Sequence, residues 1–172
     1  MKLLITGKPR SGKTTLCKRI IDPLGSEYKV GGILTQEIKE GGVRKGFKVR
    51  DLARGKEGVL AHVNQKRGPR IGRYHVNMRD LEDIGAKAIL HAIDACDLVV
   101  IDEVGPMELH SKGFIEAVGK AFNSDKHVMA TIHFKSRHEL IEKLKNRKDV
   151  TLVEIDENNR DELLEKLKRF KG

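Results

Sequence analysis

The chain begins with a short apolar run, a glycine-bounded loop and a helical segment, and this order constrains its fold more than any other feature. Residues 2–6 form the apolar run, and residues 7–14 read Gly-Lys-Pro-Arg-Ser-Gly-Lys-Thr. The loop matches G-x-x-x-x-G-K-[ST] at every fixed position and lies between a strand and a helix, as that pattern requires. The sequence therefore predicts a phosphate-binding loop.

Each conserved position of this pattern has a physical role. The two glycines let backbone N–H groups turn inward into an anion-sized nest, and the helix N-terminus adds a partial positive charge. Lys13 is expected to reach the β and γ phosphates of a nucleotide. The Thr14 hydroxyl is expected to be a ligand of Mg²⁺.

A second apolar run ends in two carboxylates. Leu-Val-Val-Ile at residues 98–101 is followed by Asp102 and Glu103. A phosphate-binding loop needs a strand-end carboxylate to hold the metal, so Asp102 is predicted to bind Mg²⁺ together with Thr14. Glu103 is predicted to take a proton from an attacking water, which favours hydrolysis over transfer. The alternative for Glu103 is a cap on the next turn or a pair with a local arginine.

Hydrophobic periodicity predicts alternating strands and helices over most of the chain. This alternation indicates an α/β fold with a mainly parallel sheet, helices on both faces and a ligand crevice at the carboxyl ends of the strands. Strands are expected at residues 2–6, 33–38, 44–50, 59–63, 98–101, 128–132 and 150–155. Helices are expected at residues 13–22 with Pro23 as the stop, at 79–95, from near Ser111 to Phe122, after a Ser136/Glu139 capping box, and after Asn159 with Leu163, Leu164, Leu167 and Phe170.

Glycine punctuation changes the pattern between residues 30 and 76. Gly41-Gly42 separates two alternating runs, which predicts an antiparallel hairpin. We therefore expect one domain over residues 1–172, with a β-rich insertion at about residues 30–76 on one edge of the sheet. A length of 172 residues leaves little room for a second full domain.

The same insertion carries most of the net charge. The chain has 34 Lys and Arg against 25 Asp and Glu, a net charge of +9, and residues 44–73 alone hold ten basic and two acidic residues. Such a segment favours an anionic partner, either nucleotide phosphates or nucleic acid. The alternative is a solvated hairpin whose charges form ion pairs with one another. The charged composition of the whole chain is typical of a thermophile.

Several classes of protein are excluded. Cys17 and Cys96 are too few for a disulfide framework or a four-thiolate zinc site, and no HExxH spacing occurs. The apolar run at residues 98–101 is far too short to span a membrane, and the N-terminus lacks the apolar core of a signal peptide. A cytoplasmic location is expected.

Some polar residues remain secondary candidates. Thr131 and His133 end another apolar strand, where a polar side chain can sense the γ-phosphate, although a solvated or hydrogen-bonded histidine is the simpler interpretation. Arg10, Arg73 and Arg137 are candidates to neutralise charge in the transition state. Residues 156–160, after the last strand, are candidate neighbours of the nucleotide base.

Together these motifs resemble a known family, the small cancer-related or thermophilic nucleoside-triphosphatases. The segments that carry the resemblance are the loop at residue 7, Gly32 with Thr35 and Glu37, Gly46-Phe47, residues 72–76, residues 101–109 (Ile-Asp-Glu-Val-Gly-Pro-Met-Glu-Leu) and residues 159–161. The run Asp-Glu-x-Gly-x-Met-Glu-Leu is the most specific of them. Arg10 departs from the family pattern, which commonly has a small residue there.

The resemblance implies a P-loop NTPase fold of three layers and slow, Mg²⁺-dependent hydrolysis of ATP, GTP and other nucleoside triphosphates to the diphosphate and phosphate, with broad base tolerance. It also implies which residues contact the nucleotide. These are Gly7, Lys8, Pro9, Arg10, Ser11, Gly12, Lys13, Thr14, Thr15, Leu98, Val99, Val100, Ile101, Asp102, Glu103, Val104 and Gly105.

Two other functions remain open at this stage. A small nucleotide or metabolite kinase would use the basic segment at residues 44–73 as an acceptor lid. A nucleic-acid-binding module is less favoured, because Phe47 and Tyr74 are the only aromatic residues near that segment on which bases could stack. The base preference and the oligomeric state stay open, with a monomer preferred.

Overall fold

One mixed sheet runs through the protein, and its two halves differ in strand direction. The computed structural model describes residues 1–168. The nine strands of this part of the chain are ordered β5-β6-β4-β3-β2-β7-β8-β1-β9. The parallel half contains β2 (Val30–Glu40), β7 (Leu98–Val104), β8 (His127–Ile132), β1 (Lys2–Thr6) and β9 (Thr151–Glu154). The antiparallel half adds β3 (Val43–Asp51), β4 (Glu57–His62), β6 (Tyr74–Val76) and β5 (Arg70–Ile71).

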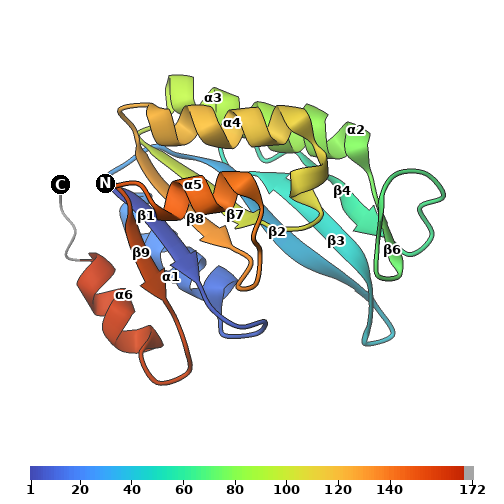
Figure 1. Cartoon of the computed structure of the whole chain (residues 1–172), viewed down its shortest axis with the longest axis horizontal. Coiled ribbons are helices and arrows are strands. Elements are labelled where there is room, and N and C mark those ends of the chain that lie inside the picture. The colour runs from blue at the N-terminus through green and yellow to red at the C-terminus, as the bar shows by residue number, and fades with distance from the viewer. Residues whose placement is uncertain (169–172) are drawn as a thin grey trace.

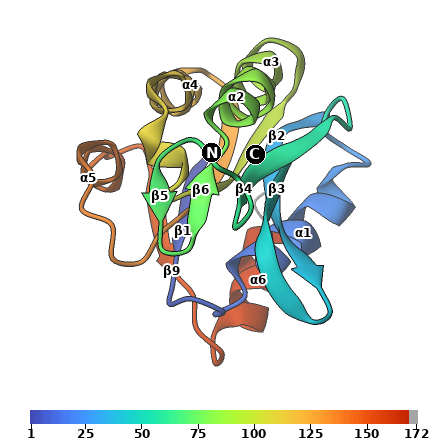
Figure 2. The ribbon, with the colours of Figure 1, turned by 90° about the vertical axis from the view of Figure 1, so that its right-hand side faces the viewer.

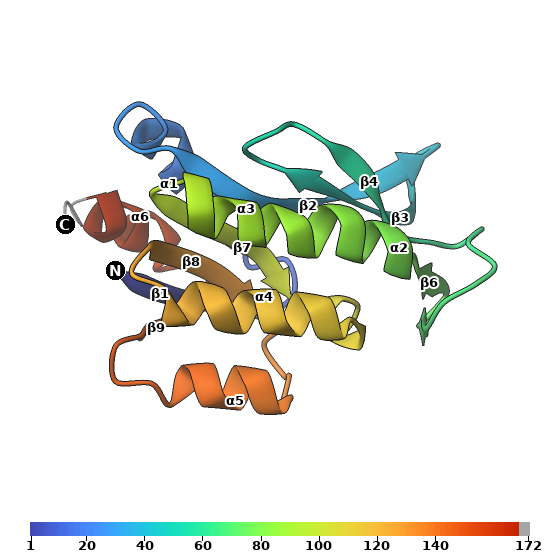
Figure 3. The same cartoon turned by 90° about the horizontal axis from the view of Figure 1, so that it is seen from above.

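Helices cover both faces of the sheet, as the alternating pattern predicts (Figure 1). One face carries α2 (Met78–Asp80), a π-helical turn (Leu81–Ala86), α3 (Lys87–Ala95), α4 (Lys112–Asn123) and α5 (Glu139–Lys145). Figure 3 shows α3, α4 and α5 side by side on this face, with α1 (Lys13–Leu24) and α6 (Arg160–Lys168) on the other side of the sheet. The α/β fold class is confirmed. No helix in residues 1–168 is long and apolar enough to cross a bilayer.

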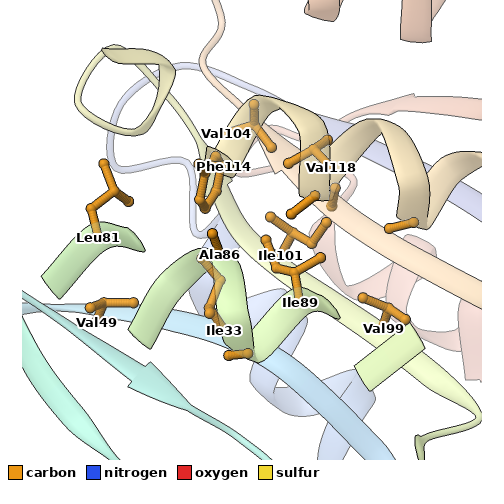
Figure 4. Close-up of a cluster of buried hydrophobic side chains, with 14 of the residues drawn as sticks. Ile33, Val49, Leu81, Ala86, Ile89, Val99, Ile101, Val104, Phe114 and Val118 are labelled. Carbon is orange, nitrogen blue, oxygen red and sulfur yellow. The ribbon is translucent and has the colours of Figure 1, made fainter. Parts of the chain in front are cut away.

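Alternate residues of the central strands pack against opposite helical layers. Leu4 and Ile101 belong to the larger apolar cluster beneath α3 and α4, whereas Leu3 and Val100 belong to a second cluster with α1 and α6. Because both faces are buried, these strands read as continuous apolar runs rather than as an apolar–polar alternation. Phe114 of α4 lies in the middle of the larger cluster, surrounded by side chains from the sheet and α3 (Figure 4).

The Gly41-Gly42 hairpin between β2 and β3 is confirmed, with φ values of 55° and 76° at the two glycines. The expected insertion begins later than residue 30, however. Val30–Leu34 of β2 pair in parallel with β7, so this stretch belongs to the central sheet. From residue 35 onward β2 no longer pairs with β7 and forms one arm of the hairpin.

Several predicted boundaries are wrong. Pro23 lies inside α1, which ends at Leu24 because Gly25 N–H still donates to Ile21 O at 2.8 Å. The Ser136 cap is not formed: His138 precedes α5, and its Nδ1 accepts from Leu140 N at 3.2 Å. The helix expected at residues 79–95 is interrupted by the π-helical turn, which no periodicity signals.

Other predicted ends are confirmed, and two strands were missed. Ser111 caps α4 by accepting from Phe114 N at 3.0 Å, and α6 begins directly after Asn159. Strands β5 and β6 were not predicted, because they are too short to show an alternation. Phe170 and the side chain of Leu167, expected on the last helix, lie outside the part that the structure describes.

Phe114→Ala is expected to lower the free energy of unfolding by about 3–5 kcal/mol, because the ring is fully buried and its removal leaves a cavity. Urea denaturation followed by circular dichroism measures this loss. Val43→Ala, at an exposed apolar position on the hairpin, is the matched control and is expected to change stability by less than about 0.5 kcal/mol. Equal losses in the two variants would contradict the assigned core.

Candidate active site

The glycine-rich loop connects β1 to α1 and is packed too closely for side chains at its two glycines. A Cβ at Gly7 would lie 2.5 Å from Ile155 O and 2.6 Å from Ser11 Oγ. At Gly12, which has φ 93°, a Cβ would lie 2.7 Å from a guanidinium nitrogen of Arg160. The start of α6 therefore lies against the loop, next to the N-terminus of α1, which would face a bound anion.

Arg10 is the one residue of the described chain other than glycine that has a positive φ, 65°. An L-residue in this left-handed conformation costs roughly 1–2 kcal/mol, which glycine avoids. The backbone therefore explains why glycine suits this position better than arginine. The Arg10 side chain is exposed and lines the cleft above the loop.

Lys13, the first residue of α1, folds back over the loop. Its Nζ donates to Gly7 O at 2.8 Å and to Lys8 O at 3.2 Å, which holds the ammonium group inside the curve of the loop. Thr14, the next residue, lies near Asp102 at the end of β7, and its hydroxyl lowers the pKa of that carboxyl group. Parallel pairing of β1 with β8, and of β8 with β7, brings these distant segments together.

Asp102 is a buried carboxylate with one oxygen bonded and one oxygen free. Its side chain is 1% exposed; Oδ1 accepts from Thr131 Oγ1 at 2.6 Å. Oδ2 is also buried, and no described residue forms a hydrogen bond with it. Burial raises the pKa of Asp102, opposed by the hydroxyls of Thr131 and Thr14 and by the charge of Lys13. A hard oxygen ligand with an unsatisfied lone pair is suited to a magnesium ion.

Glu103 lines the cleft next to Asp102. Burial raises its pKa, and the neighbouring Asp102 carboxylate raises it further, while Lys13 lowers it. A raised pKa makes a carboxylate a stronger proton acceptor, so Glu103 has the chemistry of a general base. His133 also lines the cleft, and its pKa is lowered by burial and by Lys13.

A third carboxyl group, that of Glu108, lies behind Glu103. Glu108 is 3% exposed, and its Oε2 accepts from Gly105 N at 3.1 Å. Burial, together with the charge of Glu103, raises the pKa of Glu108 to about 8, so this group is mainly neutral at pH 7. Glu108 entered the sequence analysis only as part of a motif, because nothing in the linear pattern reveals that it is buried.

Lys13, Thr14, Glu103 and His133 open onto one cleft of about 1060 Å³, whereas Asp102 and Glu108 are buried outside its lining. It is lined by Gly7, Pro9, Arg10, Gly12, Lys13, Thr14, Thr15, Lys18, Thr35, Gln36, Glu37, Arg44, Phe47, Glu103, His133 and Phe134. Arg44 and Phe47 fall in the basic segment that the kinase alternative uses as an acceptor lid. Thr35, Gln36 and Glu37 were not predicted as part of a site, since no sequence pattern shows that the hairpin stands beside the loop. One side of the cleft is thus the predicted phosphate-binding loop, and the other side is the hairpin.

Other predicted contact residues lie elsewhere. Residues 98–101 and Val104 are buried in the apolar clusters, so their side chains do not reach the cleft. Lys8, Ser11 and Gly105 also lie outside the cleft lining. Of the candidate arginines only Arg10 lines it; Arg73 instead donates from Nε to the Tyr74 hydroxyl at 3.3 Å.

Comparison with known proteins agrees with the resemblance of the motifs. The sequence model of the family described as NTPase matches residues 2–168. The chain belongs to this family. Membership places it among the nucleoside-triphosphatase enzymes, whose substrates are nucleotides, and the resemblance inferred from the sequence is confirmed.

Relatives of this family member match over most of the chain. A protein named nucleoside-triphosphatase THEP1 from Methanosarcina acetivorans is 50% identical over 144 residues, 83% of this chain and 81% of the relative. One of the same name from Thermofilum pendens is 53% identical over 131 residues, 76% and 72% of the two chains.

Two solved structures share the fold. THEP1 from Aquifex aeolicus superposes with a TM-score of 0.87 at 30% identity, covering 97% of this chain and 96% of the other. A human cancer-related nucleoside triphosphatase gives 0.81 at 32% identity, covering 96% and 94%.

Glu108 is expected to make stability depend on pH. Between its ordinary pKa of 4.5 and about 8, the folded chain keeps a proton on Glu108 that the unfolded chain releases. The stability that this proton contributes is complete below pH 4.5 and is lost as the pH rises through about 8. The free energy of unfolding should therefore fall with rising pH, by up to about 1.4 kcal/mol per unit.

Glu108→Gln should remove this slope, so that the variant gains stability relative to the wild type as the pH rises through that window. Urea denaturation at a series of pH values measures the difference, with Glu116→Gln at an exposed position of α4 as the control. Parallel curves for the wild type and Glu108→Gln would contradict the raised pKa.

Proposed function

We propose that the protein is a Mg²⁺-dependent nucleoside triphosphatase that hydrolyses ATP, GTP and other nucleoside triphosphates to the diphosphate and phosphate with broad base tolerance. The observation that carries this proposal is that Lys13, Thr14 and Glu103 line one cleft, with the buried Asp102 close to the hydroxyl of Thr14. Family membership supports the reaction class.

The donor groups fit a magnesium ion. Thr14 and Asp102 would hold it, because the buried Oδ2 of Asp102 has no hydrogen-bond partner among the described residues and Thr14 supplies a second hard oxygen. Magnesium binds through few protein oxygens and keeps waters and substrate phosphates as its other ligands. When bound, it supplies Lewis-acid polarisation of the phosphate oxygens. Thr131 orients the carboxylate through its short bond to Oδ1.

The protein's own groups position the phosphates and remove a proton. In this proposal the ammonium of Lys13 leaves the loop carbonyls for the β and γ phosphates, and the loop N–H groups and the N-terminus of α1 stabilise the charge that develops there. Glu103 accepts a proton from the attacking water at its carboxylate. Arg10 adds a cation on the solvent side of the cleft.

Broad base tolerance follows if the protein binds mainly the phosphates. The segment after β9 is the proposed neighbour of the base, because Ile155 O and the guanidinium of Arg160 lie against the two loop glycines. Asn159, in this segment, uses its side chain on the local backbone: Oδ1 accepts from Asp156 N at 2.9 Å and Nδ2 donates to Glu154 O at 3.0 Å.

Glu103→Gln is expected to reduce kcat by roughly 10²–10⁴-fold with little change in nucleotide affinity, because the amide cannot accept the proton. Phosphate release from ATP, GTP, CTP and UTP, with and without Mg²⁺, measures turnover, and equilibrium titration measures binding. Glu116→Gln is the control. Full turnover in Glu103→Gln would remove this residue from the mechanism.

Lys13→Ala is expected to reduce both nucleotide affinity, by roughly tenfold or more, and turnover. The reason is that the ammonium group stabilises the phosphates in both the ground and transition states. The same two assays apply, and Lys112→Ala on α4 is the matched control. Unchanged affinity in Lys13→Ala would show that this side chain does not contact the phosphates.

A further inference from the structure

The hairpin side of the cleft is a built surface that the hydrolysis of a nucleotide does not use. Leu34 of β2 pairs with Asp102 of β7, and β2 then continues from Thr35 to Glu40 beyond that level. The hairpin and the loop after β1 project from the same edge of the sheet (Figure 2). We call the cleft-lining residues Thr35, Gln36, Glu37, Arg44 and Phe47 the hairpin wall.

The hairpin wall is held in place by contacts that lie within the insertion. Arg44 donates from Nη1 to Glu37 Oε1 at 2.8 Å and from Nε to the Tyr74 hydroxyl at 3.1 Å. Its guanidinium carbon lies 5.2 Å from the centre of the Phe47 ring, and that ring meets Tyr74 edge-on at 5.3 Å. A flat cation and a flat ring are thus fixed at the cleft surface, an arrangement on which a planar heterocycle stacks.

The cleft has room for a second molecule. Its volume of about 1060 Å³ is slightly above the range of roughly 300–1,000 Å³ of ordinary ligand pockets. In the sheet order, β9 flanks β1 on the side away from β7 and β2. A nucleotide whose phosphates lie on the loop and whose base lies near residues 156–160 therefore leaves the hairpin wall free.

The charge of the wall selects the chemistry of that molecule. Arg44, the one cation of the wall, pairs with Glu37, which also pairs with Lys39 outside the cleft lining. The other cations of the cleft, Arg10, Lys13 and Lys18, lie on the loop side, where the phosphates of the nucleotide would take them up. Such a wall disfavours an anion and favours a neutral ligand with hydrogen-bond donors. Thr35 and Gln36 offer further polar groups for the edge of a base.

From these observations we infer that the hairpin wall binds a nucleoside as a second substrate, and that the enzyme transfers the γ-phosphoryl group to a sugar hydroxyl of this nucleoside as well as to water. The inference rests on the proposed function, because it uses the same phosphate-binding loop and the same general base, Glu103. The hydroxyl oxygen forms a bond to the γ-phosphorus while the bond from that phosphorus to the bridging oxygen breaks. The bridging oxygen leaves with the electron pair on the diphosphate, and the hydroxyl proton passes to Glu103.

The test uses the intact protein with Mg²⁺ and ATP labelled at the γ-phosphate, and adds adenosine, guanosine, cytidine, uridine or thymidine singly. We expect at least one nucleoside to yield labelled nucleoside monophosphate, with a matching deficit of free phosphate relative to ADP. ADP that equals free phosphate with every nucleoside overturns the inference and leaves hydrolysis intact. Absence of ADP in all reactions would instead overturn the proposed function.

A parallel set of reactions supplies the corresponding nucleoside monophosphates. Little or no labelled diphosphate is expected from them, because Arg44, the one cation of the hairpin wall, is paired with Glu37 and is not available to hold the added phosphate. Faster transfer to a monophosphate than to its nucleoside would overturn the assignment of a neutral ligand.

Variants locate the second site. Phe47→Leu is expected to raise KM for the nucleoside by roughly fivefold or more, with kcat of transfer affected less, because the flat stacking surface is lost. Val43→Ala, on the same hairpin but outside the cleft lining, should leave both constants unchanged. If Phe47→Leu does not fold, Gln36→Ala provides the same test without disturbing the ring cluster. Equal KM values in the wild type and the wall variant would overturn the placement.

Discussion

The burial of the Asp102 carboxylate at the end of a central strand is the constraint around which this site is arranged. The group is out of contact with water, and Thr131 satisfies only one of its oxygens. A buried unsatisfied carboxylate oxygen costs free energy, so the fold tolerates it only where function or a further ligand compensates. The parallel pairing of β1, β8 and β7 places the loop with Lys13 and Thr14 directly against this acid.

The parts of the fold that local chemistry dictates could be predicted from the sequence. The loop between β1 and α1, the paired acids near the end of β7 and the Gly41-Gly42 hairpin each depend on residues that are close together in the chain. The π-helical turn, the burial of Glu108 and the position of the hairpin wall depend on packing between distant segments, which periodicity does not encode. The capping pattern at Ser136 failed for a local reason, because the imidazole of His138 took the capping role.

The basic segment is less free to attract anions than its composition indicates. Arg44 pairs with Glu37, Lys48 with Glu57, and Arg54 with Asp51, whose carboxylate is almost fully buried. Acids from within the insertion and from the first arm of the hairpin thus absorb part of the charge. The ion-paired hairpin, which the sequence left as an alternative to a nucleic-acid surface, accounts for these residues.

Strand β2 has a consequence for how this architecture can diversify. It is bonded to β7 along one edge and to β3 along the other, and a side chain at Gly31 would collide with Cys96 and Ala92 of the helical layer. Substitutions at its base must therefore satisfy three neighbours at once. At its tip no neighbour restricts a side chain, and only the positive φ values of the two glycines limit their replacement. During evolution, changes in the length and side chains of the hairpin should therefore accumulate around its tip. Proteins with a common ancestor could then differ in what they bind there, while the residues at the base of β2 stay the same.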